Sequence, residues 1–151
     1  MPTFLEQIRD GTFVATSIAD VLGFRLTSVS EGEASFEMVI DPARHGNVMG
    51  TLHGGVVATL ADSAMGFAFA STLAEEESFA TLEMKVSFLR PVWRATLTAT
   101  AHVVHRGRTT GLVECRLVDE RDRLIAHSTC TCLVLRGSQA AGRGLGDSAP
   151  A

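Results

Sequence analysis

The apolar residues of the chain are concentrated in one long stretch, residues 52–74, which reads LHGGVVATLADSAMGFAFASTLA. In a helical conformation this stretch is apolar on all sides, a pattern typical of a helix in a deep interior or a membrane. Apart from His53, its only ionisable side chain is that of Asp62. Because a buried carboxylate is costly unless it is paired or hydrogen-bonded, the pattern indicates a central helix whose aspartate has a use.

Shorter apolar runs on both sides of this stretch predict strands. Two runs precede it, and the Glu31-Gly32 pair between them is typical of a hairpin. Four runs rich in β-branched residues follow it. The six predicted strands are residues 24–30, 33–40, 79–89, 95–105, 109–118 and 124–135. This order predicts an α+β fold in which an antiparallel sheet of five to six strands curves around the helix.

Two short helices are predicted in the N-terminal segment, residues 1–22. Thr3 and Glu6 have the spacing of a capping box, and Gly11 closes the first helix. The second helix covers residues 17–22.

Residues 1–136, which include this N-terminal segment, are predicted to form a single domain, because a chain of 151 residues is long enough for one core. Residues 41–50 contain one proline and two glycines and predict a loop that leads into the central helix. Residues 137–151 have no apolar periodicity, which predicts a disordered tail.

Composition excludes several classes of protein. The net charge of −4 argues against nucleic-acid binding, which normally needs a basic face. Cys115, Cys130 and Cys132 form neither a CxxC pair nor an even set, so we expect no zinc site, no disulfide framework and a reducing, cytoplasmic location. The N-terminus lacks the apolar core of a signal peptide. The central aspartate and the missing basic flanks argue against a membrane-spanning helix.

The frame NVMGTLHGGVVATLAD, together with the later run TLEMKVSFLRP, resembles the signature of the hot-dog thioesterases, specifically the phenylacetyl-CoA type. The resemblance covers residues 20–135 and rests on Asn47, Gly50, His53, Gly54, Gly55 and Asp62. It implies a hot-dog fold, a long central helix wrapped by an antiparallel sheet, and a homodimer whose two sheets join. It also implies hydrolysis of acyl- or aryl-coenzyme A thioesters without a metal or a cofactor beyond the substrate's own coenzyme A.

The resemblance also implies a role for each site residue. Asp62 matches the catalytic carboxylate, and Gly54 matches the amide of the oxyanion hole. Asn47 matches a polar residue near the attacking water or the thioester carbonyl. Thr81 matches a hydroxyl that assists this water, and His53 matches a residue that orients the turn.

The same chemistry can be argued from the residues. Thioester hydrolysis places negative charge on the carbonyl oxygen, and the first amides of a helix are free to donate to such an oxygen. Gly54 and Gly55 let a substrate approach these amides without a side chain in the way. Asp62 either takes a proton from water or attacks the thioester directly, and both routes remain open.

The spacing of Gly54 and Asp62 predicts a site shared between two chains. Eight residues of helix separate them by roughly 12 Å along one axis, too far for both to act on one carbonyl. If both act there, Asp62 comes from a second, antiparallel copy of the helix, and two-fold symmetry then produces two sites per dimer.

Each of these residues also has a plainer interpretation. Asp62 is alternatively a structural carboxylate, Asn47 a residue that makes its own turn, and Thr81 an ordinary strand residue. His102 and His105 are expected on opposite faces of a strand, so we predict no metal site.

Arginines are the candidates for the phosphates of coenzyme A, because their forked donors suit phosphate. Three stand at predicted strand ends and are otherwise solvated: Arg90, Arg106 and Arg108.

Two rival functions remain open. One is a hot-dog hydratase or dehydratase acting on acyl thioesters, and the other is a non-catalytic acyl-CoA-binding dimer. The sequence leaves undetermined the acyl or aryl group and the choice between a dimer and a tetramer of two dimers.

Overall fold

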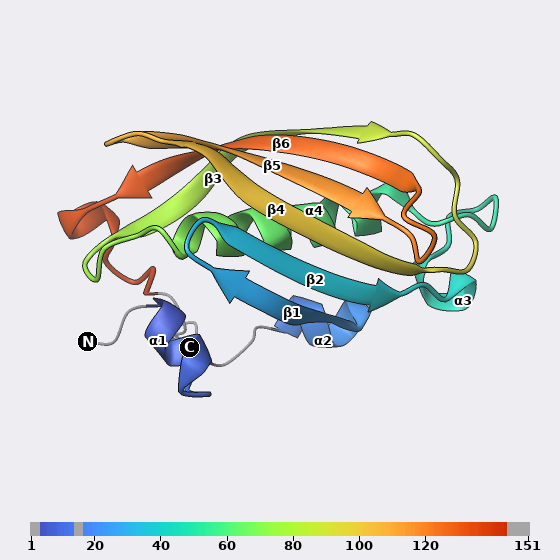
Figure 1. Cartoon of the computed structure of the whole chain (residues 1–151), viewed down its shortest axis with the longest axis horizontal. Helices are drawn as coiled ribbons and strands as arrows, with labels where there is room; N and C mark the ends of the chain where they lie inside the picture. The colour runs from blue at the N-terminus through green and yellow to red at the C-terminus, as the bar shows by residue number, and fades with distance from the viewer. Residues whose placement is uncertain (1–3, 14–16, 145–151) are drawn as a thin grey trace.

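One antiparallel sheet and one long helix make up most of the molecule, as the computed structural model shows for residues 4–13 and 17–144 (Figure 1). The sheet order is β1-β2-β4-β5-β6-β3, so β1 and β3 are its edges. The strands are β1 (Phe24–Ser30), β2 (Glu33–Val39), β3 (Ser78–Phe88), β4 (Thr96–Arg106), β5 (Thr110–Val118) and β6 (Leu124–Leu135). The predicted α+β arrangement with six strands is confirmed.

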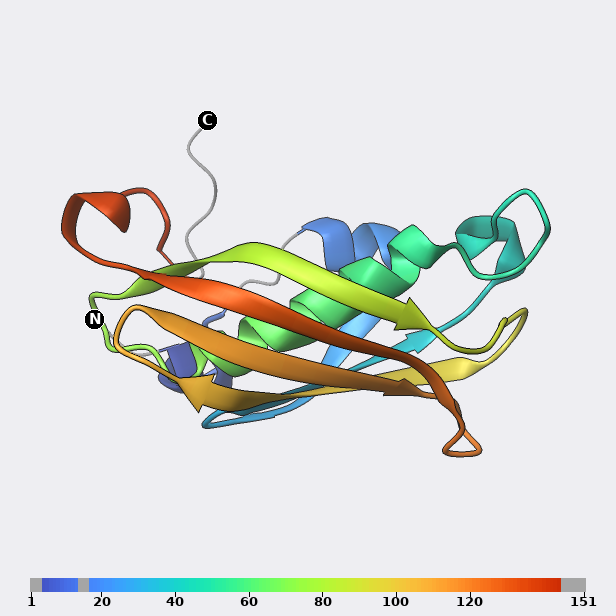
Figure 2. The same ribbon diagram turned by 90° about the horizontal axis from the view of Figure 1, so that it is seen from above.

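The long helix α4 (Gly54–Ala70) lies along one face of this sheet, which curves around it (Figures 1 and 2). The helix is shorter than the predicted 52–74. At its C-terminal end, the hydroxyls of Ser71 and Thr72 donate to the carbonyls of Ala68 and Phe69, at 2.7 Å each. These side chains satisfy carbonyls of the last turn, and the helix ends there.

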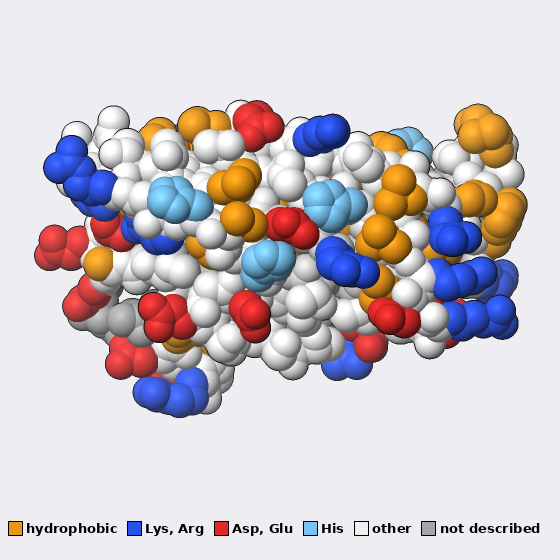
Figure 3. Space-filling model, turned by 45° about the horizontal axis from the view of Figure 1, so that its top comes forward, with side chains coloured by type: hydrophobic (Ala, Val, Ile, Leu, Met, Phe, Trp, Pro, Cys, Tyr) orange, Lys and Arg blue, Asp and Glu red, His pale blue; other side chains and the backbone are white. Residues whose placement is uncertain are grey.

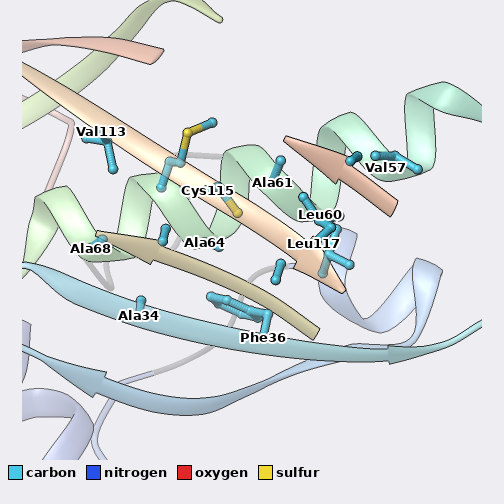
Figure 4. Close-up of a cluster of buried hydrophobic side chains, with 14 of the residues drawn as sticks. Ala34, Phe36, Val57, Leu60, Ala61, Ala64, Ala68, Val113, Cys115 and Leu117 are labelled. Atoms are coloured by element: carbon cyan, nitrogen blue, oxygen red, sulfur yellow. The ribbon is translucent and has the colours of Figure 1, made fainter. Parts of the chain in front are cut away.

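Small side chains on the inner side of α4 allow it to lie close to the sheet. Ala61, Ala64 and Ala68 are completely buried in the core cluster that also contains Ala99 and Ala101 of β4. Figure 4 shows these helix residues among larger side chains of the strands, which fill the space between them: Phe36, Val113, Cys115 and Leu117. Helix and sheet therefore form a dense core in which the position of α4 is closely defined.

The outer side of α4 is only partly covered by the described residues. Gly55 and Asp62 are exposed, and Ala58, Thr59 and Ser63 are partly buried. The expectation of a helix buried on every side is therefore wrong for the single chain. Hydropathy does not distinguish small residues that face a core from small residues that face outward.

The short helices partly match their predictions. Helices α1 (Phe4–Arg9) and α2 (Ser17–Leu22) lie where they were expected. Thr3 of the predicted capping box lies outside the described residues. The predicted loop 41–50 contains an unexpected helical turn, α3 (Pro42–His45), because Asp41 caps it by accepting a hydrogen bond from Ala43 N.

One prediction about strand faces is wrong. His102 and His105 of β4 are both exposed on the outer face of the sheet. A β-bulge between Val103 and His105 inserts an extra residue, so the alternation of faces shifts by one position.

The C-terminal segment begins with a 310 helix, Gly137–Gln139. Further along, the carbonyl of Arg143 accepts a hydrogen bond from the Ser78 hydroxyl at 2.6 Å. Residues 145–151 of the predicted tail lie outside the described part. Among the described residues, no helix has both the length and the apolar character needed to cross a bilayer.

The close packing of α4 predicts a strong effect at Gly111 of β5. A Cβ atom there would lie 2.2 Å from Cε2 of Phe69 and 3.0 Å from the His105 carbonyl oxygen. We expect Gly111→Ala to lower the free energy of unfolding by about 1–3 kcal/mol, measured by urea denaturation, because the ring or the strand must shift. The exposed neighbour variant Thr110→Ala is the control and should change stability by less than about 0.5 kcal/mol. Equal stabilities of the two variants would contradict this packing.

Candidate active site at the start of the long helix

The first turn of α4 leaves one backbone amide free. Nδ1 of His53, the N-cap residue, accepts a hydrogen bond from Gly55 N at 2.8 Å. The Gly54 amide has no acceptor within the described residues. It therefore combines an available N–H with the positive end of the helix dipole.

The segment before the helix is anchored by buried contacts. His45 is 2% exposed, and its two ring nitrogens bond to the Leu22 carbonyl at 2.9 Å and to Asp41 N at 3.0 Å. Its carbonyl accepts a hydrogen bond from His53 N at 2.8 Å. His45 was not predicted as a functional residue. The sequence analysis expected a loop over residues 41–50, whereas His45 belongs to the helical turn α3 that forms there.

Asn47 organises the turn in front of the helix. Its Oδ1 accepts hydrogen bonds from Met49 N at 2.9 Å and Thr51 N at 3.2 Å, while its Nδ2 donates to the Thr51 hydroxyl at 2.9 Å. The plainer interpretation of Asn47, that it makes its own turn, therefore holds. One N–H of Nδ2 has no partner among the described residues and remains available to a ligand.

A pocket of about 370 Å³ opens beside this turn. It brings together Asn47, Gly54 and Arg90, three of the predicted site residues. Its other wall comes from the end of β3, the segment after it and the start of β6, including Phe88, Leu89, Val92 and Ile125. A Cβ atom on residue 54 would lie 3.1 Å from Cζ of Phe88, so a larger residue here would require a small shift of that exposed ring.

Phe88, Leu89 and Val92 were not predicted as site residues. The run SFLRPV reads as a strand end, and only the pairing of strands shows that this end lies beside Gly54. The only sequence feature that could have indicated a pocket wall here is the group of apolar residues on both sides of Arg90-Pro91.

Asp62 lies elsewhere on α4 and does not line this pocket. Its Oδ1 accepts a hydrogen bond from the Thr81 hydroxyl of β3 at 3.3 Å. Partial burial raises the pKa of Asp62 above its usual value of 3.8, and the Thr81 hydrogen bond opposes this rise. Within one chain, the structure thus joins Asp62 with Thr81 and, separately, Gly54 with Asn47.

The three predicted phosphate-binding arginines lie at two different ends of the sheet. Arg90 follows β3 at the pocket, whereas Arg106 is the last residue of β4 and Arg108 follows that strand, at the opposite end. Arg106 is already engaged, because it pairs with Glu77 at 3.0 Å and lies 5.2 Å from the centre of the Phe69 ring. Arg90 is the one of the three that lies beside the helix start.

A second, apolar pocket of about 230 Å³ lies on the other side of α4. Ser63 and Phe67 of the helix contribute to it, and Ser63 directly follows Asp62. Aromatic rings form much of its wall, with Phe36 and Phe67 in edge-to-face contact at 4.9 Å. Its wall also includes Phe13, Phe24 and Leu26.

No group of three or more His, Cys, Asp and Glu side chains within the described part of the chain is placed to hold a metal ion. Cys130 and Cys132 share the inner face of β6, with their sulfur atoms 3.7 Å apart, and both are free thiols. Burial raises the pKa of the nearby Cys115 thiol to about 12, so this thiol stays protonated.

Comparisons with known proteins show the family of the chain. Residues 49–126 match the family model described as Thioesterase superfamily. The 1,4-dihydroxy-2-naphthoyl-CoA hydrolase of Listeria monocytogenes is 30% identical over 78% of this chain and 94% of its own. The acyl-coenzyme A thioesterase PaaI of Escherichia coli is 36% identical over 72% of this chain and 75% of its own.

A solved structure supports the same conclusion. That of the E. coli PaaI protein from the phenylacetic acid degradation operon has a TM-score of 0.78 and 28% identity, and covers 87% of this chain and 93% of that one. The predicted hot-dog fold and the predicted resemblance to the phenylacetyl-CoA type are thereby confirmed. The chain belongs to the thioesterase superfamily, and the protein is a thioester hydrolase.

Proposed function

We propose that this protein hydrolyses apolar acyl- or aryl-coenzyme A thioesters to the free acid and coenzyme A. The observation that carries the proposal is the free Gly54 amide, which opens onto a pocket at the positive end of α4. An amide preorganised there stabilises the negative charge that develops on the thioester oxygen. The names of the relatives support the reaction, because one is a hydrolase of an aromatic CoA thioester and another an acyl-CoA thioesterase.

Asp62 supplies the carboxylate of the proposed reaction. It activates water as a general base or attacks the thioester carbon as a nucleophile. Partial burial raises the pKa of Asp62 from its usual value of 3.8, and the hydrogen bond from Thr81 opposes this rise because it stabilises the charged form. No metal or cofactor is needed, because the carboxylate and the amide supply both parts of the chemistry.

The active site is proposed to lie between two chains. The Gly54 amide and Asp62 are eight residues apart on one rigid helix, roughly 12 Å along its axis. Asp62 faces outward beside the exposed Gly55 and the partly buried Thr59, where a second helix can approach closely. The neighbouring β3 is an edge strand, which can pair with the β3 of another copy. A homodimer, or a tetramer of two such dimers, is therefore the proposed assembly.

The remaining site residues contribute hydrogen bonds and shape to the proposed reaction. Asn47 donates its remaining Nδ2 proton to the attacking water or the thioester oxygen, while His53 and Gly55 hold the helix start in shape. The apolar pocket beside Ser63 is suited to the acyl or aryl group, because phenylalanine rings and aliphatic side chains form most of its wall. The free thiols support a reducing, cytoplasmic setting for the enzyme.

Replacing the carboxylate tests the function directly. We expect wild type to release free coenzyme A from a panel of phenylacetyl-, benzoyl- and medium-chain acyl-CoA thioesters, detected with a thiol reagent. Asp62→Asn keeps the shape of the side chain and should lower kcat by about 10²–10⁴-fold. Its circular dichroism spectrum and Tm are the control for folding. Turnover of no thioester by wild type would favour the non-catalytic binding dimer, and water addition to enoyl-CoA would favour the hydratase.

The shared site predicts complementation between two impaired chains. Gly54→Pro removes the amide, and proline is tolerated in the first position of a helix; Gly54→Ala keeps the amide and is the matched control for the contact with Phe88. Co-expressed Asp62→Asn and Gly54→Pro chains, purified with two different tags, should regain about half of the wild-type kcat, because one of their two sites is intact. Mixed dimers as inactive as either parent would show that both groups act within one chain.

The ionisation of Asp62 predicts an acid limb in the pH profile. The carboxylate is the active form, so kcat/KM should fall as the pH drops through the pKa of Asp62, which lies above 3.8. Thr81→Val removes the hydrogen bond that favours the charged form, so the pKa should rise further and the limb should move to higher pH. A limb that stays in place or moves to lower pH would refute this role of Thr81.

A further inference from the structure

The surface around the pocket mouth carries an unusual group of exposed side chains. The segment 88–94, FLRPVWR, runs from the last residue of β3 towards β4; its first five residues line the pocket, and Trp93 and Arg94 follow them directly. Trp93, the only tryptophan of the chain, is 55% exposed there, and Phe88 and Leu89 are 60% and 52% exposed. Figure 3 shows hydrophobic and basic side chains gathered at this end of the molecule, on the right.

Backbone hydrogen bonds hold this segment in place. Arg90 N donates to the Ile125 carbonyl at 3.2 Å, and the Val92 carbonyl accepts from Leu52 N at 2.7 Å. Val92 itself is 6% exposed, so the chain is anchored immediately before Trp93. The indole is therefore presented outward from a fixed backbone, two residues along the chain from the pocket-lining Pro91.

Two arginines lie within three residues of Trp93 in the sequence. Arg90 and Arg94 are exposed, and neither guanidinium makes a hydrogen bond or an ion pair within residues 4–13 and 17–144. In contrast, Arg106 and Arg136 are both paired with Glu77, and Arg123 is paired with Asp119. Free positive charge is thus available beside the pocket, in a chain whose net charge is −4.

We infer that Trp93 is the platform on which the adenine ring of the coenzyme A thioester stacks, with Arg90 and Arg94 binding its phosphates. This inference rests on the proposed function and names the part of the substrate that the segment recognises. An aromatic ring and a purine stack face to face, and guanidinium groups bind phosphate with paired hydrogen bonds. The flexible pantetheine arm then leads from this rim into the pocket, towards the Gly54 amide.

The consequence is selectivity for the carrier of the acyl group. A thioester that lacks the nucleotide, such as an acyl-pantetheine, reaches the same pocket but makes no contact with Trp93. The enzyme therefore uses binding energy from a part of the substrate that is remote from the reacting carbon.

Fluorescence tests the stacking without any turnover. Because the chain has one tryptophan and no tyrosine, its intrinsic emission comes from Trp93. We expect coenzyme A and adenosine 3′,5′-bisphosphate to quench this emission in a saturable manner, and pantetheine to leave it unchanged. Unchanged emission at coenzyme A concentrations that inhibit hydrolysis would overturn the inference.

Kinetics of matched variants separate binding from structure. Trp93→Ala should lower kcat/KM for an acyl-CoA by about 5- to 100-fold, mainly through KM, and leave that for the same acyl-pantetheine unchanged. Trp93→Phe should keep most of the activity. Leu112→Ala, which removes another exposed apolar side chain on β5, is the control and should affect neither substrate.

Other outcomes distinguish this inference from the proposed function. Equal losses with both substrates would mean that Trp93 is structural, and dissociation of the oligomer in Trp93→Ala would mean that a second copy covers it; either result overturns the inference alone. A wild-type protein that hydrolyses acyl-pantetheine as well as acyl-CoA would do the same. If wild type hydrolyses neither thioester, the proposed function itself fails.

Discussion

The close packing of α4 against the sheet is the contact on which the rest of the structure depends. Alanines on the helix face alanines and larger residues of the strands, so the helix can neither slide nor rotate without opening voids or creating overlaps. This packing decides which helix residues point outward, Asp62 among them, and where the first amides end. A site that needs a carboxylate and an amide in defined directions is thus positioned by apolar side chains that touch no substrate.

The same rigidity explains why one chain is an incomplete catalyst in the proposed mechanism. A 17-residue helix has no hinge that could bring its first residue close to its ninth. The Gly54 amide faces a pocket whose far wall is the segment after β3, while Asp62 faces Thr81 and the open side of the helix. Symmetry offers a simple solution, because an antiparallel copy of the helix presents its own Asp62 where the first copy presents Gly54.

Local sequence patterns were sufficient for most of the fold. The strands at 24–30 and 124–135 were predicted to the residue, because alternation and turn residues mark both of their ends. The long apolar stretch also predicted the central helix, which begins two residues later than that stretch. These features depend on neighbours within a few residues, so a linear pattern contains them.

Features that depend on distant segments could not be predicted in this way. The separation of Arg90 from Arg106 follows from the order in which strands pair, and a single bulge placed His105 on the unexpected face. The exposed stripe of α4 reflects what the rest of the chain leaves uncovered. Phe88 enters the site only because β3 ends beside the helix start. In each case the missing information is the tertiary arrangement and not the chemistry of the residue.

The segment after β3 links recognition to chemistry through its backbone. The Val92 carbonyl holds Leu52, which lies two residues before the Gly54 amide, so the rim and the helix start are parts of one hydrogen-bonded unit. A substrate that binds the outer side of this segment therefore acts on the same backbone that orients the proposed oxyanion donor. Because misplacement of a donor by about 1 Å can cost 10²-fold in rate, a rigid connection of this kind makes contacts far from the thioester relevant to its hydrolysis.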